Sequence, residues 1–215
     1  MEDSVKWEQA MQSKYNSIIS MKLGSLQSCH KASRHYFASG CTKKYTAEDL
    51  ELKYTARLVA KGFKQKKGID FDEIFSPVVK MITLRLVLRI VATKDLELIQ
   101  MDVKTAFLHG DLDEDVYMKQ PEAFACESPK LSGVELVCRF RKALYGLKQG
   151  SRQWYLKFDK YMQSQGYERS QEDHCLYTQK LSDGSLIILI LYVDGMLIAG
   201  KSKDEIANLK KLLST

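Results

Sequence analysis

Cysteines are few and widely separated in this chain of 215 residues. There are five, an odd number, and no two lie close together in the sequence. This distribution argues against a disulfide framework and against a zinc knuckle. The one group of metal-ligating residue types, Cys29, His30, His35 and Cys41, has a spacing that fits no common zinc pattern.

Long apolar runs are also missing. None reaches the length of a membrane span, and Met1 to Ala10 carries charges where a signal peptide has an apolar segment. We therefore expect an intracellular protein with no membrane partner, although no signal separates cytoplasm from nucleus. The 45% hydrophobic content predicts a globular chain of one large or two small domains, and the net charge of +6 favours polyanionic partners without proving one.

The N-terminal part of the chain combines one regular segment with one irregular segment. Apolar residues at helical spacing predict a helix over residues 4–20, whereas residues 21–41 have no period and are rich in Ser, Gly and His, which predicts loop or poorly ordered chain. Alternation then predicts a strand over residues 54–63. The basic turn that follows, residues 64–68, is either a solvated loop or a phosphate contact.

The rest of the chain alternates short helices and strands. Periodicity predicts helices over residues 83–94, 151–165 and from 203 onward, the last one starting with the capping box Ser202-Lys203-Asp204-Glu205. Strands are expected over residues 96–101, 116–119, 134–140 and 175–180. Between them we expect a short helical turn over 103–109, an acidic turn over 110–115 and a surface loop over 121–133.

The segment Leu186 to Val193 is a strand candidate of a different kind, because eight apolar or aromatic residues follow one another without a polar break. Such a run is typical of a strand buried on both faces. The next two residues, Asp194 and Gly195, form the dipeptide favoured in a two-residue hairpin turn, so Met196 to Ala199 would be the returning strand. Turn chemistry alone explains Asp194. A functional role needs a second group elsewhere in the chain.

Asp102 is the candidate for that second group, because it also ends an apolar strand. If the two strands are neighbours in one antiparallel sheet, their ends bring both carboxylates to the same magnesium ions. Strand-ending aspartates are common, so the pattern by itself leaves both interpretations of Asp194 open.

Six longer motifs occur in order and at sensible spacing, and together they carry a resemblance to a known family. They are ARLVAKGF (56–63), GIDFDEIFSPVV (68–79), LIQMDVKTAFLHGDL (98–112), VYMKQPEAF (116–124), LYGLKQ with RQWY (144–155) and LYVDGMLIAGKS (191–202). In this combination the chain resembles the reverse transcriptase domain of copia-type LTR retrotransposons over residues 54–215, with a weaker match in residues 7–17.

The resemblance implies an α+β fold that is a fingers–palm fragment of a right-hand polymerase, with an antiparallel palm sheet backed by helices and no thumb. Residues 1–53 would then be an N-terminal helix and a degenerate fingers segment. The implied activity is RNA-directed DNA polymerisation with two magnesium ions, acting on an RNA or DNA template-primer and dNTPs. It does not predict an oligomeric state.

The resemblance also implies roles for individual residues. Asp102 and Asp194 match the two catalytic and metal-binding aspartates, with Val103 beside the metal. Phe107 matches the bulky residue that selects deoxynucleotides. The remaining substrate-binding positions lie in the fingers strand and in the segment that supports template and nucleotide: Arg57, Lys61, Tyr145, Gly146 and Lys148. For each of these a packing or solvated-charge role stays open.

The chain also departs from the family pattern. Gly195 stands where the family has a second aspartate, which removes one carboxylate from the metal site and predicts a strongly impaired or inactive enzyme. Thr55 replaces a usual lysine, Gly150-Ser151 replace a usual Ser-Pro, and residues 21–41 suggest a frameshifted stretch. Three interpretations follow: an impaired polymerase domain, a non-catalytic nucleic-acid-binding remnant, or a decayed product without function.

Overall fold

The computed structural model describes residues 2–20, 24–28, 35–36, 38–46, 52–119 and 136–213. These residues fall into two compact units: unit 1 comprises Met1–Ile74 and Phe107–Trp154, and unit 2 comprises Phe75–Ala106 and Tyr155–Thr215. The loop expected over residues 121–133 lies outside the described residues. No helix in the described ranges is long and apolar enough to cross a membrane.

Unit 1 contains a mixed sheet, a separate strand pair and a long helix. The four-stranded sheet has the order β1 (Gly24–Ser28), β7 (Leu136–Lys142), β6 (Asp111–Lys119) and β2 (His35–Tyr36), in which only β2 runs parallel to its neighbour. The antiparallel pair is β3 (Ala38–Thr46) and β4 (Leu52–Ala60), and the helix is α1 (Glu2–Ser20). The unit also has a single turn of 3-10 helix, η1 (Gly62–Lys64), and most of a second, η2 (Ala106–His109), whose first residue is assigned to unit 2.

Two expectations for this unit are wrong. The loop expected over residues 21–41 contains β1, β2 and the start of β3, because pairing with another strand stabilises an extended backbone even where the sequence does not alternate. The acidic turn expected over 110–115 is part of β6, whose register with β7 shifts between Asp111 and Val116. Burial alternates along the whole of β6, but four of the five residues 111–115 are acidic, so the sequence shows no apolar–polar alternation there.

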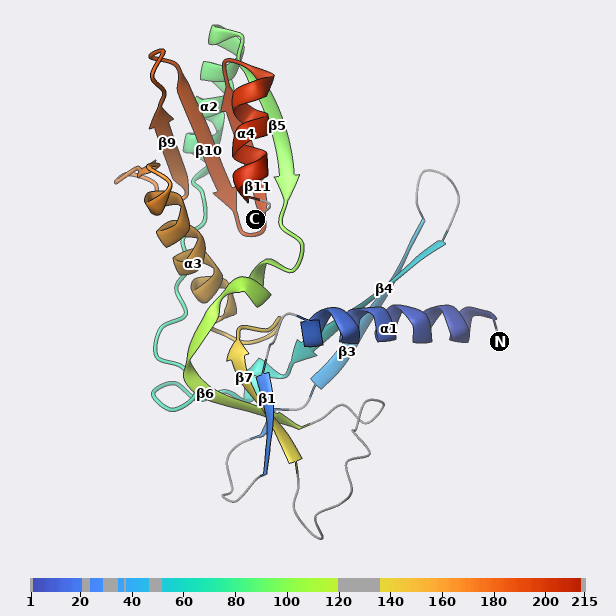
Figure 1. Ribbon diagram of the computed structural model, residues 1–215. Coiled ribbons are helices and arrows are strands. Elements are labelled where there is room, and N and C mark those ends of the chain that lie inside the picture. The colour runs from blue at the N-terminus through green and yellow to red at the C-terminus, as the bar shows by residue number, and fades with distance from the viewer. Residues whose placement is uncertain are drawn as a thin grey trace. The chain divides into compact units, whose positions relative to one another are not determined.

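Unit 2 is built on a five-stranded antiparallel sheet (Figure 1). Its order is β5 (Glu97–Asp102), β11 (Gly195–Gly200), β10 (Leu186–Tyr192), β9 (Leu176–Lys180) and β8 (Glu168–Arg169). The middle strand, β10, has five consecutive buried residues, Ile187 to Leu191. This confirms the expectation of a strand buried on both faces.

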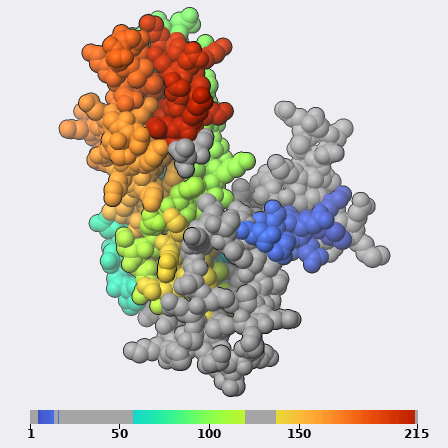
Figure 2. Space-filling view, viewed as in Figure 1, coloured from blue at the N-terminus to red at the C-terminus, as the bar shows by residue number. Residues whose placement is uncertain are grey.

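Helices cover both faces of this sheet. On one face, Val87 of α2 (Met81–Lys94) packs with Ile188 and Ile190 of β10. On the other face, α4 (Lys203–Leu213) places Ile206 beside Gly200. Figure 1 shows the two helices on opposite sides of the sheet, and the space-filling view shows α4 forming the outer surface on its side (Figure 2). Burial of each large aliphatic side chain in such a core contributes about 1.5–3 kcal/mol.

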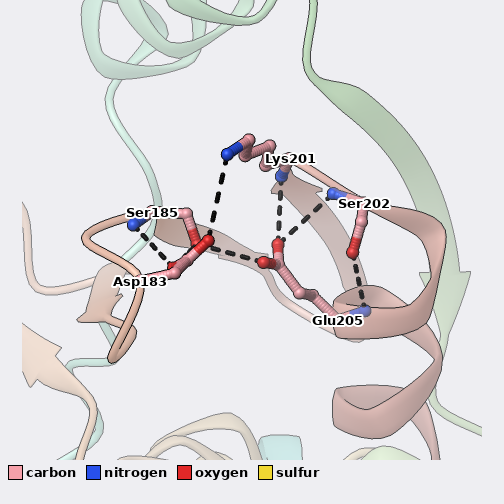
Figure 3. Close-up of polar contacts among 5 residues, drawn as sticks. All are labelled: Asp183, Ser185, Lys201, Ser202 and Glu205. Carbon is pink, nitrogen blue, oxygen red and sulfur yellow. Dashed lines mark hydrogen bonds and ion pairs between the residues drawn. The ribbon is translucent and has the colours of Figure 1, made fainter.

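The helix ends agree with the sequence signals. Glu205 accepts a hydrogen bond from the Ser202 N–H at 3.3 Å, and the Glu205 N–H donates to the Ser202 hydroxyl at 3.3 Å, so the predicted capping box is confirmed (Figure 3). The third long helix, α3 (Gly150–Ser164), ends before Gly166, which has a φ of +81°. Glycine adopts this left-handed conformation without steric cost. Over the described residues the fold is therefore mixed, with antiparallel sheets and four α-helices, as expected.

Candidate functional site

Asp102 and the turn residue Asp194 lie side by side in unit 2. Asp102 is the last residue of β5 and pairs in register with Gly195, the first residue of β11. Next to this pair, the Val103 N–H donates to the Asp194 carbonyl oxygen at 2.9 Å. Asp102 is exposed and Asp194 is half-buried. The sheet thus brings the backbones of Asp102 and Asp194, which are about ninety residues apart in the sequence, next to each other.

The turn between β10 and β11 is displaced by one residue from the expected position. Because Tyr192 pairs directly with Gly195, the two loop residues are Val193 and Asp194, and the predicted Asp194-Gly195 turn is wrong. The displacement follows from register, since pairing of Gly195 with Asp102 keeps this glycine inside β11. Val193 therefore takes the left-handed conformation with φ +58°, which costs a β-branched residue on the order of 1–3 kcal/mol.

Gly195 is not required by the backbone at its position. It is absent from the glycines with positive φ, and an added Cβ would lie 3.6 Å from the Tyr192 oxygen and 3.9 Å from the Met101 oxygen. Both distances are ordinary van der Waals contacts. Directly paired residues of an antiparallel pair point to the same face of the sheet, so a side chain at 195 would lie beside Asp102.

The donor types at this position suit magnesium. Two carboxylates, from Asp102 and Asp194, and the Val103 carbonyl are hard oxygen ligands, and Mg²⁺ in polymerase-type sites is held by one or two carboxylates together with substrate phosphates. Among the described residues there is no group of three or more His, Cys, Asp or Glu side chains that could hold a metal by themselves. The arrangement fits an ion shared with phosphates and does not fit a cage made by protein alone.

The other candidate residues lie in unit 1. The Ala60 N–H at the end of β4 donates to the Tyr145 carbonyl oxygen at 2.7 Å. Gly146 has φ +91°, and a Cβ there would lie only 2.1 Å from the Ala60 oxygen. A Cβ on Gly62 would lie 1.9 Å from the Gly146 oxygen. Gly62 and Gly146 therefore permit a close approach of these backbone segments that a side chain at either position would prevent.

Aromatic rings contact several of the candidate side chains near the Ala60–Tyr145 backbone bond. The rings of Phe107 and Tyr145, both half-buried, lie with centroids 4.8 Å apart. The Lys148 ammonium is 5.0 Å from the centroid of the Phe71 ring and donates to the Gln65 carbonyl oxygen at 3.3 Å. Lys61 is half-buried directly after β4. Arg57 pairs with Cys41 in the strand register, but its side chain lies outside the described part of the chain.

Two buried glutamines next to these residues were not predicted from the sequence. Gln149 is fully buried and Gln65 is 4% exposed. Their side chains bond to each other, with the Gln65 Nε2 donating to the Gln149 Oε1 at 2.9 Å. Gln149 is the last residue of the motif LYGLKQ, and its place in that motif could have marked it as important. No local pattern in the sequence indicates that Gln65 lies beside it.

A second polar network lies in the core of unit 2. Asp159 on α3 accepts hydrogen bonds from Arg169 at 2.7 Å and from the Tyr177 hydroxyl at 3.0 Å. Burial, together with the charge of Asp159, raises the pKa of Tyr177 above its ordinary range. All three groups are paired within the network, which indicates a structural role.

The comparison with protein families gives a clear result. The family model for reverse transcriptase (RNA-dependent DNA polymerase) matches residues 30–215. The chain belongs to this reverse transcriptase family, and the resemblance inferred from the motifs is confirmed. The match begins well before residue 54 and so includes part of the segment that the motifs had left outside the family.

The similar proteins are Pol polyproteins of plant transposons. A retrovirus-related Pol polyprotein from transposon TNT 1-94 of Nicotiana tabacum is 58% identical over 163 residues, which are 76% of this chain and 12% of that protein. The Pol polyproteins from transposons RE1 and RE2 of Arabidopsis thaliana are 37% and 38% identical, over 94% and 91% of this chain and 14% and 13% of their own lengths.

The chain therefore spans only a small part of these curated relatives. No solved structure gives a significant match. Because the alignment with RE1 covers 94% of the chain, it runs through residues 21–41. The expected frameshift there concerns the nucleotide sequence and stays a prediction.

Proposed function

We propose that this chain is the fingers–palm part of the RNA-directed DNA polymerase of a copia-type Pol polyprotein, with unit 2 as palm and unit 1 as fingers. The observation that carries the proposal is the pairing of β5 with β11, which sets Asp102 beside the Asp194 turn. In the proposal, Asp102, Asp194 and the Val103 carbonyl hold magnesium. When bound, magnesium would neutralise charge on the phosphates during nucleotidyl transfer.

The substrate-binding roles are assigned to unit 1. Arg57 and Lys61 supply positive charge toward the triphosphate, and Tyr145, Gly146 and Lys148 support the template and the incoming nucleotide. Phe107 crowds the 2′ position of the sugar and so favours dNTPs over ribonucleotides. The contact between the Phe107 and Tyr145 rings, whose centroids are 4.8 Å apart, supports this role. A ring packed against another aromatic ring is less free to move away from a sugar that approaches it.

Gly195 makes this polymerase strongly impaired. Without the second aspartate, one negative ligand is missing from the proposed site, and groups that act as a unit lose activity together. The backbone at 195 accepts a side chain without strain. The loss of activity therefore comes from the missing metal ligand and not from a changed fold, and a single substitution should restore activity.

Primer extension with a homopolymer template, dNTPs and magnesium tests the proposal. Gly195→Asp is expected to raise incorporation by about 10² to 10⁴-fold over the natural chain, because a restored carboxylate completes the metal ligands. Gly195→Asn has the same size without the charge and is the matched control, expected to stay near the natural level. Adding Asp102→Ala to Gly195→Asp should abolish the gain.

Absence of incorporation by the Gly195→Asp chain, with the fold intact by circular dichroism, would contradict the polymerase proposal. The second candidate, a nucleic-acid-binding remnant, would then be favoured. It is supported by the basic turn expected over residues 64–68, here called the basic loop, which contains Lys64, Lys66 and Lys67 in unit 1. Salt-dependent binding to a primer-template distinguishes this remnant from a product without function.

A further inference from the structure

Gln65 and Gln149 are unusual because glutamine side chains are mostly exposed in folded proteins, whereas Gln149 is fully buried and Gln65 is 4% exposed. They lie 84 residues apart in the sequence and form a buried side-chain hydrogen bond of 2.9 Å. The pair joins two segments of unit 1: residues 60–71, which include the basic loop, and residues 144–149, which include Tyr145, Gly146 and Lys148.

Each remaining polar atom of the pair is used to fix the backbone around it. The Gln65 Oε1 accepts the Lys148 N–H at 2.8 Å. The Gln149 Nε2 donates to the Asp70 carbonyl oxygen at 3.0 Å and lies 3.4 Å from a Glu114 carboxylate oxygen. The two amides therefore connect both segments and β6 in one hydrogen-bond network in which every amide nitrogen and oxygen has a partner.

Lys148 is the residue whose position depends most on this network. Its N–H is held by the Gln65 side chain, and its ammonium donates to the Gln65 carbonyl oxygen at 3.3 Å beside the Phe71 ring. Lys148 itself is exposed. An ammonium has three donors, so it can keep its bond to Gln65 and still meet a phosphate oxygen.

We propose that the Gln65–Gln149 pair is a positioning device that holds the two segments as one rigid element and thereby sets the Lys148 ammonium for the triphosphate of a dNTP. The second half of this statement rests on the proposed function. A buried amide pair adds little net stability compared with apolar residues of the same size, but its directional bonds allow only one relative placement of the segments. That directionality is what a phosphate-binding position requires.

Hydrogen exchange of the full chain tests the first half without any nucleotide. In Gln149→Ala and in Gln65→Ala, amide exchange should rise about tenfold or more in residues 60–71 and 144–149 together, because each variant breaks the same network. Gln153→Ala is the matched control, since Gln153 is a half-buried glutamine on α3 only four residues from Gln149 and its side chain bonds to Asp113. Its backbone N–H donates to the Gln149 carbonyl oxygen at 3.0 Å, and alanine keeps this bond. It should leave both segments unchanged.

Binding of a fluorescent dATP analogue in the presence of magnesium tests the second half. Its Kd should rise about tenfold in Gln65→Ala and Gln149→Ala, while the Kd for a primer-template changes less than about twofold and Gln153→Ala matches the natural chain. The double variant should be no weaker than either single variant, because the two residues act as one unit. Gln65→Ala keeps the test valid if Gln149→Ala does not fold.

The outcomes separate the two proposals. Exchange that rises only around the substituted residue would overturn the rigid pair. A natural chain that binds the analogue with the same Kd as both glutamine variants would overturn the positioning of Lys148. A natural chain that binds no nucleotide at all would overturn the proposed function, and hydrogen exchange would still decide whether the pair holds the two segments together.

Discussion

Among single residues, Asp173 shows how one carboxylate fixes the start of a helix. It is buried, and its Oδ2 accepts the N–H of Lys80, the N-cap residue of α2, at 2.9 Å. Its Oδ1 accepts the Cys175 N–H at 3.1 Å. Lys80 offers no side-chain cap of its own, so Asp173 supplies from a distance the acceptor that the first turn needs.

Asp173 should make the stability of the protein depend on pH. Burial raises the pKa of this carboxyl, but hydrogen bonds from the Thr83 hydroxyl and from the Lys80 and Cys175 N–H groups outweigh it and lower the pKa below its ordinary value. A lowered folded-state pKa stabilises the native state above the unfolded pKa of about 3.9, and this contribution is lost as the pH falls through the folded value.

Asp173→Asn is therefore expected to lower the free energy of unfolding by about 1–2 kcal/mol at pH 7, with a difference that shrinks as the pH falls through the lowered folded-state pKa of Asp173. Urea unfolding at a series of pH values measures it. Glu168→Gln, an exposed carboxylate on β8, is the control and should change stability little at any pH. A difference that stays constant down to about pH 2 would rule out the charge as its source.

Residue roles were predictable where the signal was local. Asp102 and Asp194 each end an apolar run, so their meeting could be inferred once the strands were assumed to be neighbours. Asp173 and Gln65 carry no such signal for their long-range bonds, because Asp173 bonds Lys80 93 residues away and Gln65 bonds Gln149 84 residues away. Partners at that separation are set by the tertiary structure, which a pattern of neighbouring residues does not contain.

At the scale of secondary-structure elements, the start of α4 is the best-defined junction. Glu205 accepts the N–H groups of Lys201 and Ser202 at 3.2 and 3.3 Å, and its other oxygen accepts the Ser185 hydroxyl at 3.0 Å (Figure 3). Lys201 also lies 3.9 Å from Asp183 in the turn before β10. The same glutamate thus caps the helix and joins it to the neighbouring turn.

Removing this junction should loosen α4. We expect Ser202→Ala and Glu205→Ala each to lower the free energy of unfolding by about 1 kcal/mol, as is usual when a helix cap is removed, with a double variant less destabilised than the sum of the two. Urea unfolding measures both effects. Asn208→Ala, an exposed change within α4, is the control and should not destabilise the protein. Additive effects would contradict a reciprocal capping box.

Elements with a strong period were predictable, and those without one were not. The apolar period of α2 and the unbroken run of β10 agree with the structure to within a few residues. By contrast, β1 to β3 and the first half of β6 have no alternation, and they are strands because of the strands that pair with them. Strand propensity depends on such neighbours more than helix propensity does.

At the scale of the whole molecule, the order of motifs predicted the family, but not the division of the chain. Unit 1 combines residues 1–74 with 107–154, and the segment between them belongs to unit 2. Ala60 of the first segment shares a core with Val116 and Phe140 of the second. Unit 1 is thus formed by two segments that are distant in the sequence. No linker or change in composition marks where the chain passes from one unit to the other.

Charge is the property of the whole molecule that bears most on its partners. With a net charge of +6, the chain should bind a primer-template with an affinity that falls as salt rises. If the basic loop meets the phosphates, replacing Lys64, Lys66 and Lys67 by Gln should reduce the slope of log K against log salt by about 1 for each of these lysines that binds a phosphate. Fluorescence anisotropy across a salt series measures this slope.

The control must separate local contacts from total charge. Replacing Lys203, Lys210 and Lys211 of α4 by Gln lowers the net charge from +6 to +3, the same change as in the loop variant. These lysines are exposed on a helix that forms one surface of unit 2 (Figure 2). We expect the α4 variant to keep the natural slope, because counterions are released only by charges that meet phosphates. An equal decrease of the slope in both variants would mean that the protein attracts nucleic acid by its overall charge and that the basic loop is simply solvated.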